Sequence, residues 1–421
     1  MTEKKLSRNV AVVGVGMSKF GAFPDKTSRD LLVEAYQELK TSVDKGFDPR
    51  EIEAFYMGNF SSDQFEWQAH LAPIAASWLG LSPIPTLRLE DACASSSVAL
   101  RQASLAIASG LYDIVLVGGV EKMTDLPIAK VTDALASAAD TQFEIPAGFT
   151  FPGFYAAMAT AYMHEYQADP EAFKHVAIKN HQNGALNEKA QFNQTIASVM
   201  EGKKAKAAAK GLPVPTWQDE LEFLSDPKGN PMIAWPMTLF DCSPVSDGGV
   251  LLLLVSEEIA KKFTDNPIYI VGSGQASDGA LSERDSLCSV PAAEKAGKQA
   301  YAMAGLTPDD INFAEVHDCF TIAEIMASED LGFFPRGEGW KAAMAGETAR
   351  TGRHPINTSG GLKAKGHPVG ASGAGQVVEV WKQLRGIAGE RQLPGELKFG
   401  LTHNVGGTGQ TCVVHIFEKR N

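Results

Sequence analysis

The chain has 421 residues, which is enough for two to three domains with a large hydrophobic core. Hydrophobic residues make up 44% and charged residues 21%, an ordinary globular composition that excludes a disordered or fibrous protein. Because 38 Lys and Arg stand against 50 Asp and Glu, the formal net charge is −12, and we expect no nucleic-acid partner.

The first residues carry charge but lack the apolar core of a signal peptide. The longest aliphatic run, residues 250–255, is far shorter than the roughly 20 residues of a membrane span. We therefore predict a cytoplasmic protein without a membrane partner. The chain has 5 cysteines, an odd number, and they form no C-x-x-C pair, which argues against a disulfide framework and a structural zinc site.

Strand-like and helix-like segments alternate along the chain, and the same series occurs twice. Residues 12–16 resemble residues 270–274, residues 49–55 resemble residues 308–314, and the strands expected at 113–119 and 250–255 match those at 398–402 and 412–417. Helices are expected at 28–42, 95–109 and 292–304. The series therefore predicts two homologous α/β halves.

The first half is interrupted by a long insertion. We predict a first half made of residues 1–120 and 241–265, an inserted loop domain at 121–240, and a second half at 266–421. Gly14 and Gly16 suggest a dinucleotide-binding turn, but Lys19 stands where the third glycine of that motif belongs. A simple turn that ends the first strand is the better interpretation.

The segment around Cys93 is a candidate nucleophile site. It lies between a strand-like segment at 86–89 and an alanine-rich helix, so Cys93 should lie at a strand-to-helix turn. Backbone N–H groups and the positive end of the helix dipole would stabilise a thiolate there and lower the pKa of Cys93. A small buried cysteine without chemistry is the alternative from these residues alone.

A glycine-rich segment at 357–373 presents His367. It occupies the place in the second half that the Cys93 segment occupies in the first, so the duplicated halves should bring the two loops together. Imidazole is the natural base for a thiol. A phosphate-binding loop is the alternative, but the segment lacks the Gly-Lys-Ser/Thr ending of such loops.

Two further segments of the second half carry histidines. His317 and Cys319 follow the end of an expected strand, and their spacing places them on one face of an extended chain. Such titratable groups are costly in a core unless they are used or paired, although a core thiol beside a hydrogen-bonded histidine is an alternative. His403 precedes Gly406 and Gly407, whose amides could bind an oxyanion; a plain turn is the alternative.

Together these four segments resemble the thiolase superfamily over essentially the whole chain. Cys-Ala-Ser at Cys93 matches the nucleophile motif of that family, and Gly-His-Pro at His367 matches its activating histidine. The His-Asp-Cys-Phe segment at 317–320 replaces the Asn-Glu-Ala-Phe of classical thiolases, and His403 replaces their C-terminal cysteine. Both departures resemble sterol-carrier-type and archaeal-type thiolases.

The resemblance implies a thiolase fold: two duplicated, layered α-β-α-β-α halves with a loop-domain insertion in the first. It also implies an acyl-CoA C-acyltransferase of lipid metabolism, such as an acetyl-CoA C-acetyltransferase, that makes or cleaves 3-oxoacyl-CoA by Claisen condensation or thiolysis. Coenzyme A would be a cosubstrate, with no bound cofactor and no metal.

The same resemblance implies the roles of the site residues. Cys93 would carry the acyl group, and Cys319 would move the second proton. His317 and His367 would donate to the thioester oxygen, and the amides of Cys93 and of residues 405–407 would form a second oxyanion hole. The expected oxyanion or substrate-binding residues are His403, Gly406, Gly407 and Met158.

The acyl pocket should be lined in part by the insertion. Residues 149–158 are rich in aromatic side chains and could accept a bulky acyl group; packing of a helix against the core is an equal alternative for these residues, which include Phe149, Phe151, Phe154, Tyr155 and Met158.

Three other functions stay open. A decarboxylative ketoacyl synthase shares the fold, but its motif usually reads His-Gly-Thr where this chain has Cys319. A thiolase-like retro-aldolase works with a partner subunit and tends to lose the two cysteines. A non-enzymatic acyl or lipid carrier would tolerate the loss of all four motifs.

The resemblance finally implies partners. Thiolases are commonly homodimers or tetramers, and relatives with this His-Asp-Cys-Phe pattern often act beside a small zinc-ribbon/OB-fold subunit that shapes the coenzyme A site. This chain lacks such a module, which makes an external subunit a candidate partner.

Overall fold

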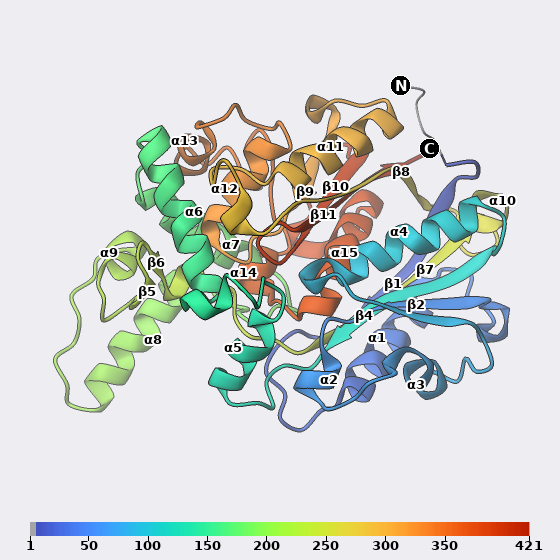
Figure 1. Cartoon of the computed structure of the whole chain (residues 1–421), viewed down its shortest axis with the longest axis horizontal. Coiled ribbons are helices and arrows are strands. Elements are labelled where there is room, and N and C mark those ends of the chain that lie inside the picture. The colour runs from blue at the N-terminus through green and yellow to red at the C-terminus, as the bar shows by residue number, and fades with distance from the viewer. Residues whose placement is uncertain (1–5, 421) are drawn as a thin grey trace.

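The computed structural model describes residues 6–420, which form helices on both faces of a nine-stranded mixed sheet (Figure 1). The strand order is β3-β2-β4-β7-β1-β8-β11-β10-β9, and a separate hairpin pairs β5 with β6. The strands are β1 (Val10–Met17), β2 (Ala54–Gly58), β3 (Thr86–Leu89), β4 (Ile114–Glu121), β5 (Met232–Ala234), β6 (Met237–Thr238), β7 (Gly248–Ser256), β8 (Ile268–Ser277), β9 (Phe313–Glu315), β10 (Phe399–Gly406) and β11 (Thr411–Lys419).

The helices follow the expected alternation with the strands. They are α1 (Ser28–Ser42), α2 (Ser62–Phe65), α3 (Leu71–Trp78), α4 (Ser95–Ala108), α5 (Ile128–Ala136), α6 (Phe151–Tyr166), α7 (Glu171–Ala185), α8 (Ile196–Ala209), α9 (Glu220–Ser225), α10 (Glu257–Ala260), α11 (Pro291–Ala304), α12 (Thr321–Asp330), α13 (Gly339–Met344), α14 (Gly361–Lys365) and α15 (Ser372–Arg385). The predicted helices at 28–42, 95–109 and 292–304 correspond to α1, α4 and α11.

The sheet repeats about its centre, as the duplicated sequence predicts. β1 and β8 pair antiparallel there, and outward from them β7, β4 and β2 of the first half match β11, β10 and β9 of the second. The place of β3 is taken in the second half by Ile356, which forms a parallel bridge to Ala314 of β9. The segments that follow β3 and Ile356 are therefore equivalent, and they carry Cys93 and His367.

Gly14 and Gly16 lie within β1 rather than in a turn after it, so the predicted turn is wrong. Their absent side chains let α1 lie against the strand: a Cβ on Gly16 would stand 2.1 Å from the carbonyl oxygen of Ala35. The second half repeats this contact, since a Cβ on Gly274 would stand 2.0 Å from the carbonyl oxygen of Ala296 in α11. Both glycines serve close helix–strand packing.

The layers are arranged around α4 and α15, which contact each other in the middle of the molecule. Both helices share a hydrophobic core with β1, β4 and β7. α1 packs on β1 and β7, while α11 packs on β8 and β11 (Figure 1). The result is the layered α-β-α-β-α arrangement that was expected, and it sets the N-terminal ends of α4 and α15 beside one another.

The insertion between β4 and β7 contains α5 to α9 and the β5–β6 hairpin. α6 and α7 pack on the second half, whereas α8 and α9 project to the left in Figure 1. The domain boundaries at residues 120, 240 and 265 stay predictions. Within residues 6–420, no helix combines the length and the apolar character that crossing a membrane requires.

Candidate active site

Two equivalent turns from the two halves meet at the centre of the molecule. Ala92–Ala94 forms a 3-10 turn that continues into α4, and Val369–Ala371 forms one that continues into α15. The first turn contains Cys93, and the second begins two residues after His367. One donor atom each from Cys93, His317 and His367 lies within 4.8 Å of the other two. The fold thus brings together three residues that lie up to 274 positions apart.

Cys93 is held in an uncommon backbone geometry. The preceding residue, Ala92, has a φ of 48°, in the region that favours glycine. The sulfur accepts hydrogen bonds from the amides of Gly407 and of Cys93 itself, but burial outweighs them and raises the pKa of the thiol to about 12. The expected lowering of this pKa is wrong, because the surrounding apolar side chains remove the water that would stabilise a thiolate.

The hydrogen bonds of His367 decide which ring nitrogen carries its proton. Its Nδ1 lies 2.7 Å from the hydroxyl of Ser372, and that hydroxyl donates its single hydrogen to the carbonyl of Pro368 at 2.8 Å. Ser372 can therefore only accept from Nδ1–H, and Nε2 keeps a free lone pair. Burial lowers the pKa of His367 to about 3, so the ring is neutral and able to accept a proton.

His317 has the opposite arrangement. The hydroxyl of Ser97 donates to Oδ1 of Asn404 at 3.0 Å, which turns the amide nitrogen of Asn404 toward Nδ1 of His317, also at 3.0 Å. Nδ1 of His317 accepts this hydrogen bond, so Nε2 carries the hydrogen. This buried Nε2–H lacks a partner among residues 6–420. Burial, with His367 and His403 nearby, holds the pKa of His317 well below its usual value.

Cys319 lies in the same pocket as Cys93 and contacts Tyr155 of the insertion. The Tyr155 hydroxyl has one hydrogen, which it can donate either to the carbonyl of Gly407, at 3.3 Å, or to the sulfur of Cys319. Its ring stacks on Phe320 with the centroids 4.5 Å apart. Burial raises the pKa of Cys319 well above its usual value, while the Tyr155 hydrogen bond opposes that shift. Tyr155 is thus a positioning residue for Cys319.

The remaining predicted site residues occupy different places. Gly407 lines the pocket beside Cys93. Gly406 lies at the end of β10, where a Cβ would stand 2.5 Å from the carbonyl of Asp91, so it permits β10 to approach the Cys93 turn. His403 lies within β10 behind His317, and its Nδ1 accepts the His317 backbone N–H at 3.3 Å. Met158 is fully buried next to these two histidines, outside the pocket that contains Cys93.

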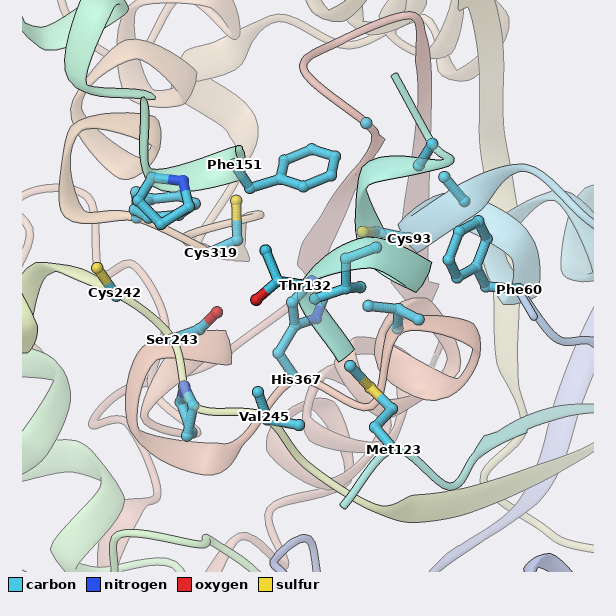
Figure 2. Close-up of a pocket in the computed structure, with 18 of the residues that line it drawn as sticks. Phe60, Cys93, Met123, Thr132, Phe151, Cys242, Ser243, Val245, Cys319 and His367 are labelled. Atoms are coloured by element: carbon cyan, nitrogen blue, oxygen red, sulfur yellow. The ribbon is translucent and has the colours of Figure 1, made fainter. Parts of the chain in front are cut away.

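The pocket has a volume of about 190 Å³ and is mostly apolar (Figure 2). Helix α5 supplies Ile128, Thr132 and Leu135 to its wall, which the sequence did not indicate, and the aromatic stretch supplies Phe151. Phe154, Tyr155 and Met158 instead pack in the core of the second half, and Phe149 stacks on Phe154. The lining residues are Phe60, Ala92, Cys93, Met123, Ile128, Thr132, Leu135, Ala138, Phe151, Pro152, Cys242, Ser243, Pro244, Val245, Cys319, Phe320, His367, Val369 and Gly407.

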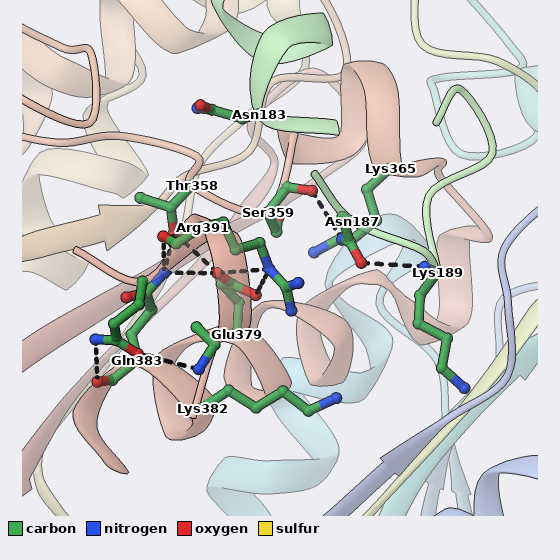
Figure 3. Close-up of polar contacts among 12 residues, drawn as sticks. Asn183, Asn187, Lys189, Thr358, Ser359, Lys365, Glu379, Lys382, Gln383 and Arg391 are labelled. Carbon is green, nitrogen blue, oxygen red and sulfur yellow. Dashed lines mark hydrogen bonds and ion pairs between the residues drawn. The ribbon is translucent and has the colours of Figure 1, made fainter. Parts of the chain in front are cut away.

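Polar contacts on both sides hold the loop that leads to His367 (Figure 3). From the segment just after α7, the amide of Asn187 donates to the carbonyl of Ser359 at 2.9 Å. On the other side, Glu379 of α15 accepts from Thr358 at 3.2 Å and from Arg391 at 2.8 Å. Because these partners are largely buried, they fix the loop more firmly than surface contacts would.

Asp318 connects the Cys319 segment to the same loop. Its carboxylate accepts the backbone N–H of Leu362 at 2.6 Å and the side chain of Asn180 at 2.7 Å. Burial and the nearby Glu324 raise the pKa of Asp318 to about 7. No sequence pattern assigns Asp318 a role of its own; in the structure it connects the two segments.

The donor set Cys93, His317 and His367 has the chemistry of a zinc site. Its histidine tautomers also fit acyl chemistry without a metal, because one lone pair and one N–H are directed by fixed partners. The expectation of a metal-free site stays a prediction.

Comparison with known proteins decides the family. Residues 10–258 match the family described as "Thiolase, N-terminal domain", and residues 273–419 match "Thiolase C-terminal domain-like". The chain belongs to the thiolase family. An acetyl-CoA acetyltransferase of Methanothermobacter thermautotrophicus is 43% identical, over 98% of this chain and 100% of that protein.

Two further proteins are similar to this thiolase over nearly its whole length. Sterol carrier protein 2 of Bos taurus is 31% identical and aligns with 99% of this chain but 73% of its own length. A solved structure described as an Ltp2-ChsH2(DUF35) aldolase is similar with a TM-score of 0.79 and 25% identity, covering 98% of both chains. The predicted resemblance to archaeal-type and sterol-carrier-type thiolases is therefore confirmed.

Proposed function

We propose that this thiolase is an acyl-CoA C-acyltransferase that joins an acyl-CoA and acetyl-CoA into a 3-oxoacyl-CoA and coenzyme A, or cleaves that product in reverse. The observation that carries the proposal is the Cys93 thiol with two neutral histidines of opposite tautomer within 4.8 Å. One histidine can accept a proton, and the other can donate a hydrogen bond to an oxygen. The acetyl-CoA acetyltransferase relative supports the same reaction.

In the first step, Cys93 attacks the thioester carbon of acyl-CoA. Its proton passes to Nε2 of His367, and the carbon–sulfur bond to coenzyme A breaks. The thiol of Cys319 donates its proton to the leaving coenzyme A sulfur, which frees coenzyme A as a thiol. The site then holds an acyl group on Cys93, a protonated His367 and a thiolate at Cys319.

In the second step, the Cys319 thiolate removes a proton from the α-carbon of acetyl-CoA. The resulting carbanion attacks the acyl carbon on Cys93, a carbon–carbon bond forms, and the bond to the Cys93 sulfur breaks. Protonated His367 returns its proton to that sulfur. All protons are accounted for, and both thiols are restored.

Two sets of donors would stabilise the negative oxygens of these steps. The unpartnered Nε2–H of His317 suits the thioester oxygen of the enolate. The amides of Gly407 and Cys93, which already point at the Cys93 sulfur, suit the tetrahedral oxygen. His403 accepts a hydrogen bond from the backbone of His317 and would not contact the substrate. Met158 lies beside both histidines and would help to hold them in place.

Coenzyme A would act as a cosubstrate and not as a resident cofactor. A homodimer or tetramer in the cytoplasm, without nucleic-acid or membrane partners, remains the prediction for this thiolase. A small zinc-ribbon/OB-fold subunit is a candidate partner. The description of the similar aldolase structure includes a DUF35 component, which supports a search for such a subunit.

The decisive experiment is Cys93→Ala with intact-mass detection of the acylated protein. The wild type should gain the mass of an acetyl group from acetyl-CoA, and the variant should neither gain it nor turn over. Turnover by Cys93→Ala would overturn the proposal. Carbon–carbon cleavage of a 3-hydroxyacyl thioester, seen only with a partner subunit, would instead support a retro-aldolase, and a requirement for malonyl thioester would support a ketoacyl synthase.

A further inference from the structure

The pocket at Cys93 is larger than an acetyl group requires. Its volume is about 190 Å³, whereas an apolar cavity of about 150 Å³ is enough to hold benzene. The acyl group on Cys93 shares this space with the acetyl group of the second substrate, and two acetyl groups together have as many heavy atoms as benzene, so they would leave about 40 Å³ of the 190 Å³ unfilled. Unfilled apolar space weakens binding because the lining atoms lose contacts.

The pocket extends to both sides of Cys93 and His367. Figure 2 shows Phe60 and Met123 on one side of these residues, with Cys242, Ser243 and Cys319 on the other. The second side contains the proton-moving Cys319, so the coenzyme A thioesters must reach the reaction from there. The first side is left for the acyl chain that Cys93 carries, and we call it the acyl arm.

The acyl arm belongs to a small hydrophobic cluster of its own. Phe60, Met123 and Val369 are buried there, and Leu135 and Cys93 pack against them. These side chains come from segments after β2 and β4, from α5 and from the turn before α15. Four separate segments thus build one apolar wall directly beside the reactive sulfur.

The lack of charge among the lining residues narrows the class of acyl group that the arm can bind. Among the described residues that line the pocket, none is Asp, Glu, Lys or Arg. A carboxylate at the far end of an acyl chain would lose its hydration there without gaining a cation as partner. The arm therefore discriminates against acyl groups with a charged terminus.

We propose that Cys93 carries an uncharged, apolar acyl group longer than acetyl, seated against Phe60, Met123 and Leu135. This inference rests on the proposed function and deepens it by naming the substrate class. In thiolysis the preferred substrates are then 3-oxohexanoyl-CoA and 3-oxooctanoyl-CoA, which leave butyryl and hexanoyl groups on Cys93. Acetoacetyl-CoA, which leaves an acetyl group, is the poorer substrate.

The test compares kcat/KM for thiolysis of acetoacetyl-CoA, 3-oxohexanoyl-CoA, 3-oxooctanoyl-CoA and 3-oxoadipyl-CoA. Each buried methylene favours binding by roughly fourfold, so 3-oxohexanoyl-CoA should exceed acetoacetyl-CoA by about tenfold. 3-oxoadipyl-CoA matches it in chain length but ends in a carboxylate, and it should be at least about tenfold poorer than 3-oxohexanoyl-CoA. Acetoacetyl-CoA as the best substrate, or equal rates for the charged and uncharged chains, would overturn the inference.

Leu135→Phe tests the location of the arm, because Leu135 of α5 lines the pocket and packs in the same hydrophobic cluster as Phe60 and Met123. The larger side chain should lower the ratio of 3-oxooctanoyl-CoA to acetoacetyl-CoA activity by about tenfold. Asp133→Phe is the matched control on the same helix, since the Asp133 side chain is 72% exposed, and this ratio should not change. An unchanged ratio in a folded Leu135→Phe protein would place the acyl chain elsewhere and overturn the inference.

Intact-mass measurement of the wild type tests the acyl arm and the proposed function separately. Acylation by acetyl-CoA, butyryl-CoA and hexanoyl-CoA would support both. Acylation by acetyl-CoA alone would overturn the acyl arm and leave the proposed function standing. Acylation by none of the three would overturn the proposed function itself.

Discussion

His367 donates through its ring Nδ1 to the hydroxyl of Ser372, five residues further along the chain, across 2.7 Å. The Ser372 hydroxyl in turn donates to the carbonyl of Pro368. This pair of hydrogen bonds leaves Nε2 of His367 as the free acceptor that Cys93 needs. Ser372, which does not contact the substrate, therefore sets the tautomer of His367. Residues that hydrogen-bond to a histidine orient its ring in the same way in other active sites.

Ser372→Ala should slow the acylation of Cys93 by about fivefold to tenfold, because one neutral hydrogen bond contributes ~1 kcal/mol and the tautomer is no longer fixed. Rapid-quench mass measurement of the acyl-enzyme would report this rate. Ser104→Ala is the matched control, since Ser104 of α4 makes the same kind of bond to the carbonyl of Leu100. Equal rates for the two variants would contradict the role of Ser372.

Alkylation of Cys93 by iodoacetamide should rise steadily with pH. The pKa of Cys93 is raised to about 12 and that of His367 is lowered to about 3, so the resting pair is a neutral thiol and a neutral imidazole across the neutral range. The thiolate fraction then grows about tenfold per pH unit, with no plateau between roughly pH 6 and 9. Cys93→Ala gives the background of the other thiols. A plateau near neutral pH would indicate a thiolate–imidazolium pair instead.

Cys319→Ala should separate the two steps of the reaction. Cys93 should still become acetylated, because His367 can accept its proton, although more slowly, because the leaving coenzyme A sulfur loses Cys319 as its proton donor; exchange of the acetyl-CoA methyl hydrogens with deuterium should fall much further, by about 10²- to 10⁴-fold. Mass spectrometry measures both. Cys288→Ala controls for loss of a buried thiol outside the pocket. Undiminished exchange in Cys319→Ala would mean that another group is the base.

Tyr155→Phe should act mainly through Cys319. Loss of the hydroxyl removes a hydrogen bond that lowers the pKa of Cys319, so deuterium exchange should slow by about tenfold and its pH profile should move to higher pH. Acetylation of Cys93, in which Cys319 only protonates the leaving coenzyme A, should slow less than the exchange does. Tyr162→Phe, on the same helix, also removes a buried hydroxyl, which donates to Glu329 away from the pocket. A purely structural role for Tyr155 would lower the rate without moving the pH profile.

The duplicated pattern of the sequence was enough to predict much of the fold. Helix α1 falls on the predicted residues 28–42, and the strand series of both halves is found in one sheet. The repeat also indicated that the Cys93 and His367 loops would meet, because equivalent loops lie at equivalent places about the centre of the sheet. Local patterns carry this information, since period and turn chemistry act over short stretches of chain.

No repeat or motif in the sequence indicated the residues that support the site. Asn404 and Ser372 act through single hydrogen bonds, and Tyr155 and α5 reach the pocket from an insertion whose placement local patterns do not determine. The glycines of β1 were assigned to a turn because their sequence pattern is the same for a turn and for close helix packing. Only the position of α1 distinguishes the two.

The sequence by itself determined which residues could react and that they lie in matching loops of two homologous halves. The tertiary structure decided what those residues are like before substrate arrives: a neutral thiol at Cys93, a base at His367 and a donor at His317. The reason is physical. Motif and repeat depend on neighbours along the chain, whereas pKa and tautomer depend on burial and on partners that distant segments bring into contact.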